Sequence, residues 1–160
     1  MFKVLLPNAI ADQLSDALQQ GGGREIGGIL MGEHVESGVF RIRAITIQRY
    51  GGTFATFERF TRPFITPLRR FFNRTGHNYT RFNYLGEWHS HPGFAPEPSQ
   101  LDCHAMWEMV DDSLVGANFA VLLIVRLLPD SELNGTATLF LPGGLRFEAQ
   151  LLHEIESYDR

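Results

Sequence analysis

Residues 86–92 read Gly-Glu-Trp-His-Ser-His-Pro, and the expected fold and chemistry of the chain depend on this stretch. Because side chains alternate between the two faces of a strand, His89 and His91 lie on the same face if the segment is extended. Pro92 cannot donate a ladder hydrogen bond, so the strand is predicted to end there. Asp102 follows ten residues after Pro92 and could supply a third ligand. Three nitrogen or oxygen ligands with one open position are typical of a hydrolytic zinc site.

The length and composition of the chain are those of an ordinary globular protein. Its 160 residues favour one domain with room for a hydrophobic core, and 44% of them are hydrophobic and 20% charged. Cys103 is the only cysteine in the sequence, which excludes an internal disulfide and favours a reducing compartment. The N-terminus does not read as a secretory signal, and the longest apolar run, 119–128, is too short to span a bilayer. We therefore expect a cytoplasmic protein with no membrane partner.

The charges are distributed unevenly along the chain. Residues 41–81 hold nine of the fourteen basic residues, all of them arginine, and only one acidic residue, Glu58. This segment is therefore +8, although the whole chain is −4. The segment is also rich in aromatic residues, and this combination bears on the choice of partner.

Hydrophobic periodicity and turn residues predict an order of elements in which strands and helices alternate irregularly. Strands are predicted near residues 2–6, 25–32, 40–47, 84–90, 119–127, 136–141 and 145–151. Helices are predicted after Asn8, around 67–72 and over 99–110. The glycines at 27, 28 and 32 indicate that another element passes close to their strand. With no repeat and no linker, the pattern predicts one α/β domain over residues 1–160.

A glutamate far before the histidines completes a longer motif. Glu25 opens the segment Glu-Ile-Gly-Gly-Ile-Leu-Met-Gly, and after the histidines come Ser99 and Asp102. The order Glu, His-x-His-Pro, Ser-x-x-Asp resembles the JAMM (MPN-plus, JAB) metalloproteases. Residues 84–92 are most similar to the bacterial Prok-JAB branch. Members of that branch are often encoded beside ubiquitin-activating-like and conjugating-like enzymes, including in anti-phage systems of the CBASS and Bil kinds.

The resemblance implies a fold as well as a chemistry. We expect a single JAMM/MPN domain whose mixed, mostly antiparallel curved β-sheet is flanked by helices, in the three-layer arrangement of cytidine deaminases. The motif itself covers residues 25–32 and 84–102, and the order of predicted elements extends the resemblance over 2–150. Residues of about 50–80 occupy the place of the first insertion in such enzymes.

The resemblance also assigns roles that agree with the chemistry of the side chains. Zn²⁺ would be held by His89, His91 and Asp102, and would lower the pKa of a bound water to about 7. Glu25 would take the proton of that water and pass it to the leaving amine. Ser99 would donate a hydrogen bond to the oxyanion of the tetrahedral intermediate.

Each of these residues also has a purely structural explanation. A lone His-x-His pair is commonly structural or solvent-exposed. Ser99 and Asp102 have the spacing of a helix capping box, which would hold both side chains at a helix N-terminus and is compatible with a metal site. A carboxylate such as Glu25 is most often solvated at a strand end. The prediction of a metal site therefore rests on the combination of the five residues.

Strand parity favours a different carboxylate. Glu87 is predicted to share the face of His89 and His91, so spacing alone would place it nearer the metal than Glu25. The resemblance assigns the base to Glu25, and a ligating Glu87 would close the coordination sphere. We take Glu25 as the base and keep Glu87 as the alternative.

Three neighbours of the motif are expected to be structural. Cys103 and His104 point in directions about 100° apart if they lie on a helix, and the sequence offers no second cysteine for a zinc site. Cys103 is therefore predicted to pack in the core and His104 to be exposed or to lie beside the ligands. Trp88, of opposite parity to the histidines, is expected in the core.

JAMM relatives cleave the isopeptide or peptide bond after the C-terminal glycine of ubiquitin or a ubiquitin-like protein. The resemblance therefore implies a ubiquitin-like protein or its conjugate as substrate, with activating-like and conjugating-like enzymes as further partners. The phenylalanines and arginines of residues 50–80 could receive an apolar patch and acidic groups of the modifier, or they could be core and solvated residues.

Three other functions remain open at this point. An arginine- and aromatic-rich segment also suits single-stranded nucleic acid, and the motif resembles the RadC-type JAMM branch linked to DNA repair. The acidic chain and the absence of the helical region of RadC-type chains disfavour a nucleic-acid partner. A catalytically inactive MPN scaffold is disfavoured by the intact motif. The same zinc chemistry could also act on a sulfur-carrier protein or a small amide.

Overall fold

The computed structural model describes residues 1–48 and 57–155, with the side chains of residues 57–64 left undescribed. The strands of this part are β1 (Phe2–Pro7), β2 (Gly27–Glu36), β3 (Val39–Ile45), β4 (Phe82–Ser90), β5 (Ala120–Leu127), β6 (Leu133–Leu141) and β7 (Leu145–Glu154). The helices are α1 (Asn8–Gly21), α2 (Phe57–Arg74) and α3 (Gln100–Asp111). The short helix predicted around 67–72 is the second half of α2. The beginning of the predicted insertion, residues 49–56, lies outside the described part.

The strands form a closed barrel in the order β1-β3-β2-β4-β5-β6-β7. The barrel closes because β1 pairs in parallel with β3 on one side and with β7 on the other. A third parallel pair joins β4 to β5, and the remaining four pairings are antiparallel. The predicted helix-flanked open α/β sheet in a three-layer arrangement is therefore wrong. Periodicity locates each strand along the chain, but the pairing of β1 with β7 joins segments at opposite ends of the sequence and leaves no local signal.

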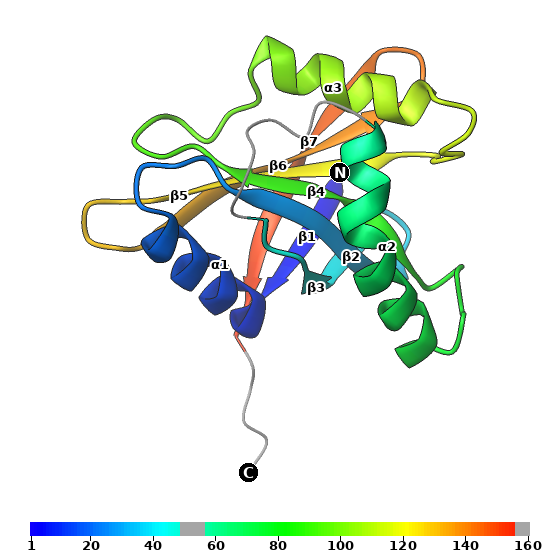
Figure 1. Ribbon diagram of the computed structural model, residues 1–160, viewed down its shortest axis with the longest axis horizontal. Coiled ribbons are helices and arrows are strands. Elements are labelled where there is room, and N and C mark those ends of the chain that lie inside the picture. Colours follow the sequence, from blue (N-terminus) through cyan, green and yellow to red (C-terminus); the bar gives the residue numbers. More distant parts are fainter. Residues whose placement is uncertain (49–56, 156–160) are drawn as a thin grey trace.

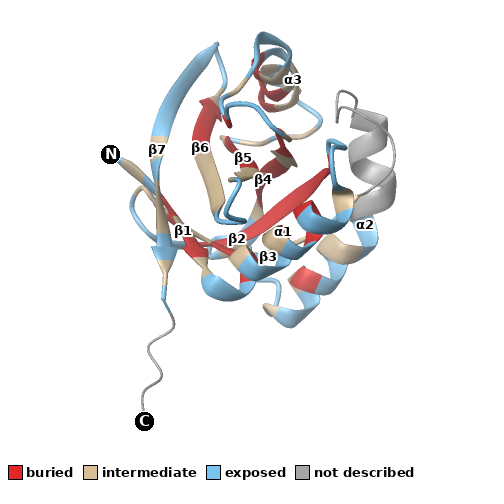
Figure 2. Ribbon diagram, turned by 90° about the vertical axis from the view of Figure 1, so that its left-hand side faces the viewer, coloured by how far each residue is buried: buried red, intermediate tan, exposed pale blue. Residues whose placement is uncertain are grey.

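The three helices occupy different sides of the barrel (Figure 1). α1 packs its buried stripe of Ile10, Leu14 and Leu18 against barrel residues that include Val4 and Trp88. α2 covers the outer side of β2 and β4, where Phe71 contacts Ile29 and Met31. α3 covers the outer side of β5 and β6 through Cys103, Met106 and Val110. Figure 2 shows that buried positions gather along β2, β4, β5 and β6, the strands between the helices.

Two glycines allow another stretch of backbone to lie very close to β2 and β4. A Cβ at Gly28 would lie 1.9 Å from the carbonyl oxygen of Thr46, and a Cβ at Gly86 would lie 1.9 Å from that of Val121. Gly86 also has φ of +156°, beside a register shift in the β2–β4 pairing. The close approach predicted from the glycine-rich segment is confirmed at Gly28.

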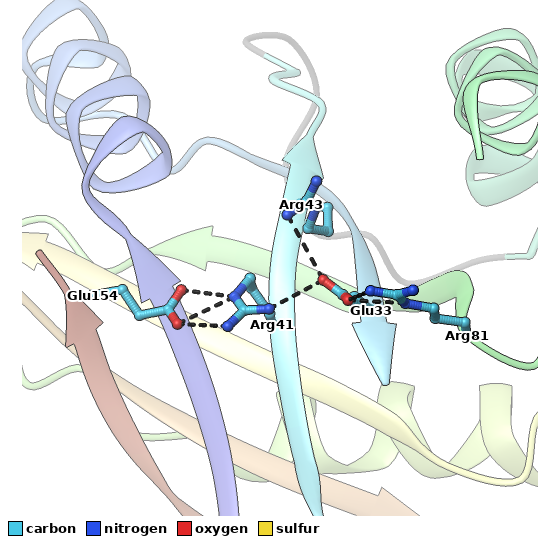
Figure 3. Close-up of polar contacts among 5 residues, drawn as sticks. All are labelled: Glu33, Arg41, Arg43, Arg81 and Glu154. Carbon is cyan, nitrogen blue, oxygen red and sulfur yellow. Dashed lines mark hydrogen bonds and ion pairs between the residues drawn. The ribbon is translucent and has the colours of Figure 1, made fainter. Parts of the chain in front are cut away.

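A cluster of charged side chains lies across the side on which the barrel closes (Figure 3). Glu33 on β2 is only 4% exposed and accepts hydrogen bonds from Arg41 and Arg81, with Arg43 at 3.7 Å. Arg41 on β3 also forms a bidentate pair with Glu154 on β7 at 2.8 Å for each nitrogen. Because Arg41 contacts both carboxylates, the cluster ties β7 to β3 and β2 across β1.

No helix of the described residues combines the length and apolar character needed to cross a membrane.

Candidate metal centre

The two histidines are presented at the end of β4. His89 pairs with Gly27 of β2, and His91 follows the last residue of the strand. Between them, Ser90 points to the opposite side and is 1% exposed. Its hydroxyl oxygen accepts a hydrogen bond from the Ile26 backbone N–H at 3.0 Å, and its own N–H donates to the Ile26 carbonyl at 2.9 Å. Ser90, which points inward, therefore anchors the outward-pointing His89 and His91 to the segment before β2.

Asp102 reaches the histidines from the first turn of α3. Its side chain accepts a hydrogen bond from the Ser99 backbone N–H at 2.8 Å, and the Ser99 hydroxyl accepts one from the Asp102 N–H at 3.1 Å. These two bonds form a complete capping box, as the spacing of the two residues predicted. The cap fixes the position and the rotamer of Asp102 at the start of the helix.

The ligand atoms of His89, His91 and Asp102 come together at one point. All three lie within 4.8 Å of one another, and no other group of three or more His, Cys, Asp or Glu side chains does so in the described part of the chain. The Nε2 atoms of the histidines are 3.1 Å apart, and they lie 3.4 and 3.5 Å from the two oxygens of Asp102. Ligand atoms about 2.0–2.1 Å from a tetrahedral zinc ion lie about 3.3 Å from one another. The three distances therefore fit a metal ion of this size.

The environment prepares these side chains for the role of ligands. The Nδ1 atom of His91 lies 2.8 Å from the carbonyl oxygen of Ala95. Since a carbonyl only accepts, Nδ1 carries the proton and Nε2 presents its lone pair to the centre. Phe94 stacks on the His91 ring at 4.2 Å and helps to bury it. Burial favours a protonated Asp102, but hydrogen bonds from His89 and Ser99 outweigh it and lower the pKa of this carboxyl well below its ordinary range.

Glu25 is not one of the three grouped side chains. It precedes Ile26, whose backbone is bonded to Ser90, and its side chain is exposed. The β2–β4 pairing ends at Gly27 and His89, so Glu25 lies on the backbone two residues before the residue paired with the first histidine.

Glu87 occupies the position that strand parity predicted for it. It lies between Ile29 of β2 and Leu122 of β5, about 7 Å along the strand from His89. Its side chain is 7% exposed, and burial raises its pKa to about 8. No hydrogen bond or ion pair reaches its carboxyl group from the described residues.

The neighbouring residues have the structural roles expected of them. Cys103 is buried against β5 and β6, and Arg146 donates a hydrogen bond to its sulfur at 3.0 Å. His104 is exposed and pairs with Glu108 one turn along α3. Trp88 is fully buried, and its indole N–H donates to the Thr46 carbonyl. All three sequence predictions are confirmed.

A comparison with protein families places this centre in a known context. A family model described as prokaryotic homologues of the JAB domain matches residues 7–136, which include every predicted site residue. The chain belongs to this family.

Two known proteins resemble this JAB domain. A protein of Enterobacter hormaechei subsp. hoffmannii (strain UCI 50), named CD-NTase/cGAS isopeptidase, is 29% identical over 116 residues. The aligned part is 71% of this chain and 61% of the relative, so the chain spans about three fifths of that protein. The solution structure of protein DSY2949 from Desulfitobacterium hafniense matches with a TM-score of 0.68 at 16% identity. That match covers 97% of this chain and 95% of the other, and it establishes a shared fold.

Two positions that serve the centre of this JAB domain escaped the sequence analysis. Ser90, between the histidines, ties the segment of Glu25 to the ligand strand, and its inward parity was the available signal. The carbonyl of Ala95 sets the tautomer of His91. Every residue type has a backbone carbonyl that can accept a hydrogen bond, so the sequence carried no signal for this second position.

Proposed function

We propose that this JAB domain is a zinc metalloprotease that cleaves after the C-terminal glycine of a ubiquitin-like protein, as an isopeptidase on conjugates or as a peptidase on precursors. The observation that carries the proposal is the convergence of His89, His91 and Asp102 at distances suited to a zinc ion. Two imidazoles and one carboxylate leave a fourth position open, which is the donor set of a hydrolytic rather than a structural site.

The residues around the centre can perform the proton transfers of amide hydrolysis. When bound, the metal ion supplies an acidified water and polarises the scissile carbonyl. Glu25 accepts the proton of the attacking water and returns it to the leaving amine. The Ser99 hydroxyl oxygen accepts from the Asp102 N–H, which leaves its own proton free to donate to the oxyanion. Asp102 stays ionised because its hydrogen bonds favour the charged form.

The substrate class rests on relatives and on resemblance. The relative named CD-NTase/cGAS isopeptidase supports an isopeptide bond as the target, within a bacterial ubiquitin-like conjugation pathway that serves anti-phage defence. Activating-like and conjugating-like enzymes would then be partners, and the protein would act in the cytoplasm. Nucleic acid is not part of this proposal.

Cleavage of a ubiquitin-like protein fused through its C-terminal glycine to a reporter tests the proposal. The wild-type chain is expected to release the reporter, to lose activity in a chelator, and to regain it with one equivalent of Zn²⁺. Asp102→Asn is expected to lower bound zinc and activity together, because an amide is a weaker ligand than a carboxylate. His104→Ala, on the exposed side of α3, is the matched control and should retain both.

Three results would contradict the proposal. Full activity after complete removal of metal would exclude the metal-dependent mechanism. Cleavage of a sulfur-carrier fusion or a small amide, with no cleavage of ubiquitin-like fusions, would keep the chemistry and replace the substrate. Binding to a single-stranded oligonucleotide that weakens steeply with salt, without any hydrolysis, would favour the nucleic-acid alternative.

A further inference from the structure

A concave site lies beside α2, and its lining includes none of the three residues of the metal centre. It encloses about 570 Å³ and is lined by residues of α1, β2, β3 and α2. Three arginines line it, Arg43 on β3 and Arg70 and Arg74 on α2. Among the described residues no carboxylate joins them in the lining, so we call this site the arginine pocket.

The positive charge of the arginine pocket is largely uncompensated. Arg70 and Arg74 are exposed, and neither has an ion pair or hydrogen bond with the described residues. Arg43 approaches one carboxylate, Glu33, at 3.7 Å. Figure 3 shows that Glu33 is also engaged by Arg41 and Arg81, so three arginines share this one carboxylate.

The architecture of α2 explains only part of this arrangement. Arg74 lies in the last turn, where a cation interacts favourably with the helix dipole. Arg70 lies one turn earlier, and like charges at i and i+4 destabilise a helix. Arg43 comes from a different element and faces the same cavity. An anionic ligand would relieve the repulsion among all three.

The lining favours carboxylates over a nucleic acid. The planar guanidinium groups can bind carboxylates or phosphates in bidentate fashion. A nucleic acid would also need an aromatic face on which a base can stack. The one aromatic residue in the described lining is Phe71, which is 3% exposed and packs against β2. Its ring is therefore not available to a base.

We propose that the arginine pocket binds an acidic segment of a partner protein. The identity of the partner rests on the proposed function: it is the protein substrate that the metal centre cleaves.

The position of the pocket suits such a partner. Met31, in its floor, lies four residues along β2 from Gly27, the residue opposite His89. Four strand residues span about 13 Å. A partner that occupies the pocket and reaches the metal centre must therefore span at least this distance, along a path outside α2, which covers Ile29.

Direct binding of a short acidic peptide tests the pocket without any cleavage. Fluorescently labelled octaglutamate is titrated with the metal-loaded chain, and anisotropy is followed at low and at high salt. The double variant Arg70→Gln/Arg74→Gln removes two charges that have no partner in the described structure. It is expected to bind the peptide about tenfold more weakly, and high salt should remove most of the difference.

The control variant removes the same two charges elsewhere. Lys3→Gln/Arg69→Gln changes an exposed residue of β1 and an exposed residue of α2 that does not line the pocket. It should bind octaglutamate within about twofold of the wild type, because neither side chain lines the pocket. Equal loss in the two variants would overturn the proposal, since the binding would then depend on net charge alone. So would tighter binding of an eight-nucleotide thymidylate that depends on Arg70 and Arg74.

A kinetic measurement connects the pocket with the metal centre. The same variants are assayed on a ubiquitin-like fusion with an acidic segment in its target and on one in which glutamine replaces the acidic residues. The pocket variant should raise KM about tenfold for the acidic fusion only and leave kcat unchanged. An equal change in both fusions would overturn the link. If the wild type cleaves neither fusion, the proposed function fails, while the peptide titration still decides whether the pocket binds acidic chains.

Discussion

Ser99 caps α3 and, on the proposed function, also donates to the oxyanion, and each role has a measurable consequence. Its hydroxyl oxygen caps α3 by accepting from the Asp102 N–H, and its proton is free for an oxyanion. Ser99→Ala should cost about 1 kcal/mol of stability through the cap and about 100-fold in kcat through the lost donor. Ser99→Gly isolates the second effect, because glycine at an N-cap costs only a few tenths of a kcal/mol. A near-normal kcat in Ser99→Gly would reduce the role of the hydroxyl to capping.

Glu25 and Glu87 compete for the role of general base. Glu25 is exposed two residues before Gly27, the partner of His89, whereas Glu87 is buried on the strand of the histidines between Ile29 and Leu122. Glu25→Gln is expected to lower kcat by about 100- to 10,000-fold while zinc stays bound, because it removes proton transfer without removing a ligand. Glu87→Gln should lower kcat far less. The opposite ranking, with metal content measured in both variants, would assign the base to Glu87.

At the scale of elements, the crossing of β2 by the residues after β3 supports the ligand strand. The Thr46 hydroxyl accepts a hydrogen bond from the Ile29 N–H, and its carbonyl accepts one from the Trp88 indole. Trp88 precedes His89, and Gly28 provides the space in which Thr46 crosses. A side chain at position 28 would therefore disturb both the strand pairing and the placement of the first histidine.

Gly28→Ala should consequently be one of the costlier glycine substitutions. Its Cβ would lie 1.9 Å from a backbone oxygen, so the strand must shift, at a cost of about 2–3 kcal/mol. Gly23→Ala is the control, because no atom lies within 4 Å of its added Cβ. Urea unfolding of the two variants measures the difference. Equal stability of Gly28→Ala and Gly23→Ala would show that the backbone of Thr46 can move away from β2 at little cost.

The elements also show where sequence reasoning was sufficient. The Ser-x-x-Asp spacing predicted the capping box, and strand parity placed Trp88 in the core and Glu87 on the outer side. These features depend on residues a few positions apart, which is the range over which backbone periodicity acts. The β2–β4 register shift beside Gly86 was not predicted, because it depends on a neighbouring strand.

On the scale of the whole molecule, the Glu33 cluster supports the closure of the barrel. Arg41 on β3 joins Glu33 on β2 to Glu154 on β7, across β1, which lies between β3 and β7 in the barrel (Figure 3). Burial would raise the pKa of Glu33, but hydrogen bonds from Arg81 and Arg41 and the charges of Arg41 and Arg43 hold it below its ordinary value. The cluster is therefore most stabilising when Glu33 is ionised.

The pH dependence of unfolding measures this contribution. A depressed carboxyl pKa adds stability above the unfolded-state value of about 4.3, and that stability is lost as the pH falls through the folded value. Glu33→Gln should cost about 2 kcal/mol at pH 7, the order of a hydrogen-bonded charge. The difference from wild type should shrink as the pH falls below about 4. A difference that is constant between pH 7 and 3 would contradict an electrostatic role.

The sequence by itself determined the capping box and the position of most strands and helices, and it predicted the three side chains, His89, His91 and Asp102, that the structure brings together. Each of these follows from residue type and short spacing, which the chain carries into any fold. The tertiary structure alone decided that the sheet closes through β1 and β7, that Ser90 anchors the segment of Glu25, and that Arg43 meets Arg70 and Arg74 in one pocket. These features join residues that are distant in sequence, and only the packing of the complete chain determines which of them meet.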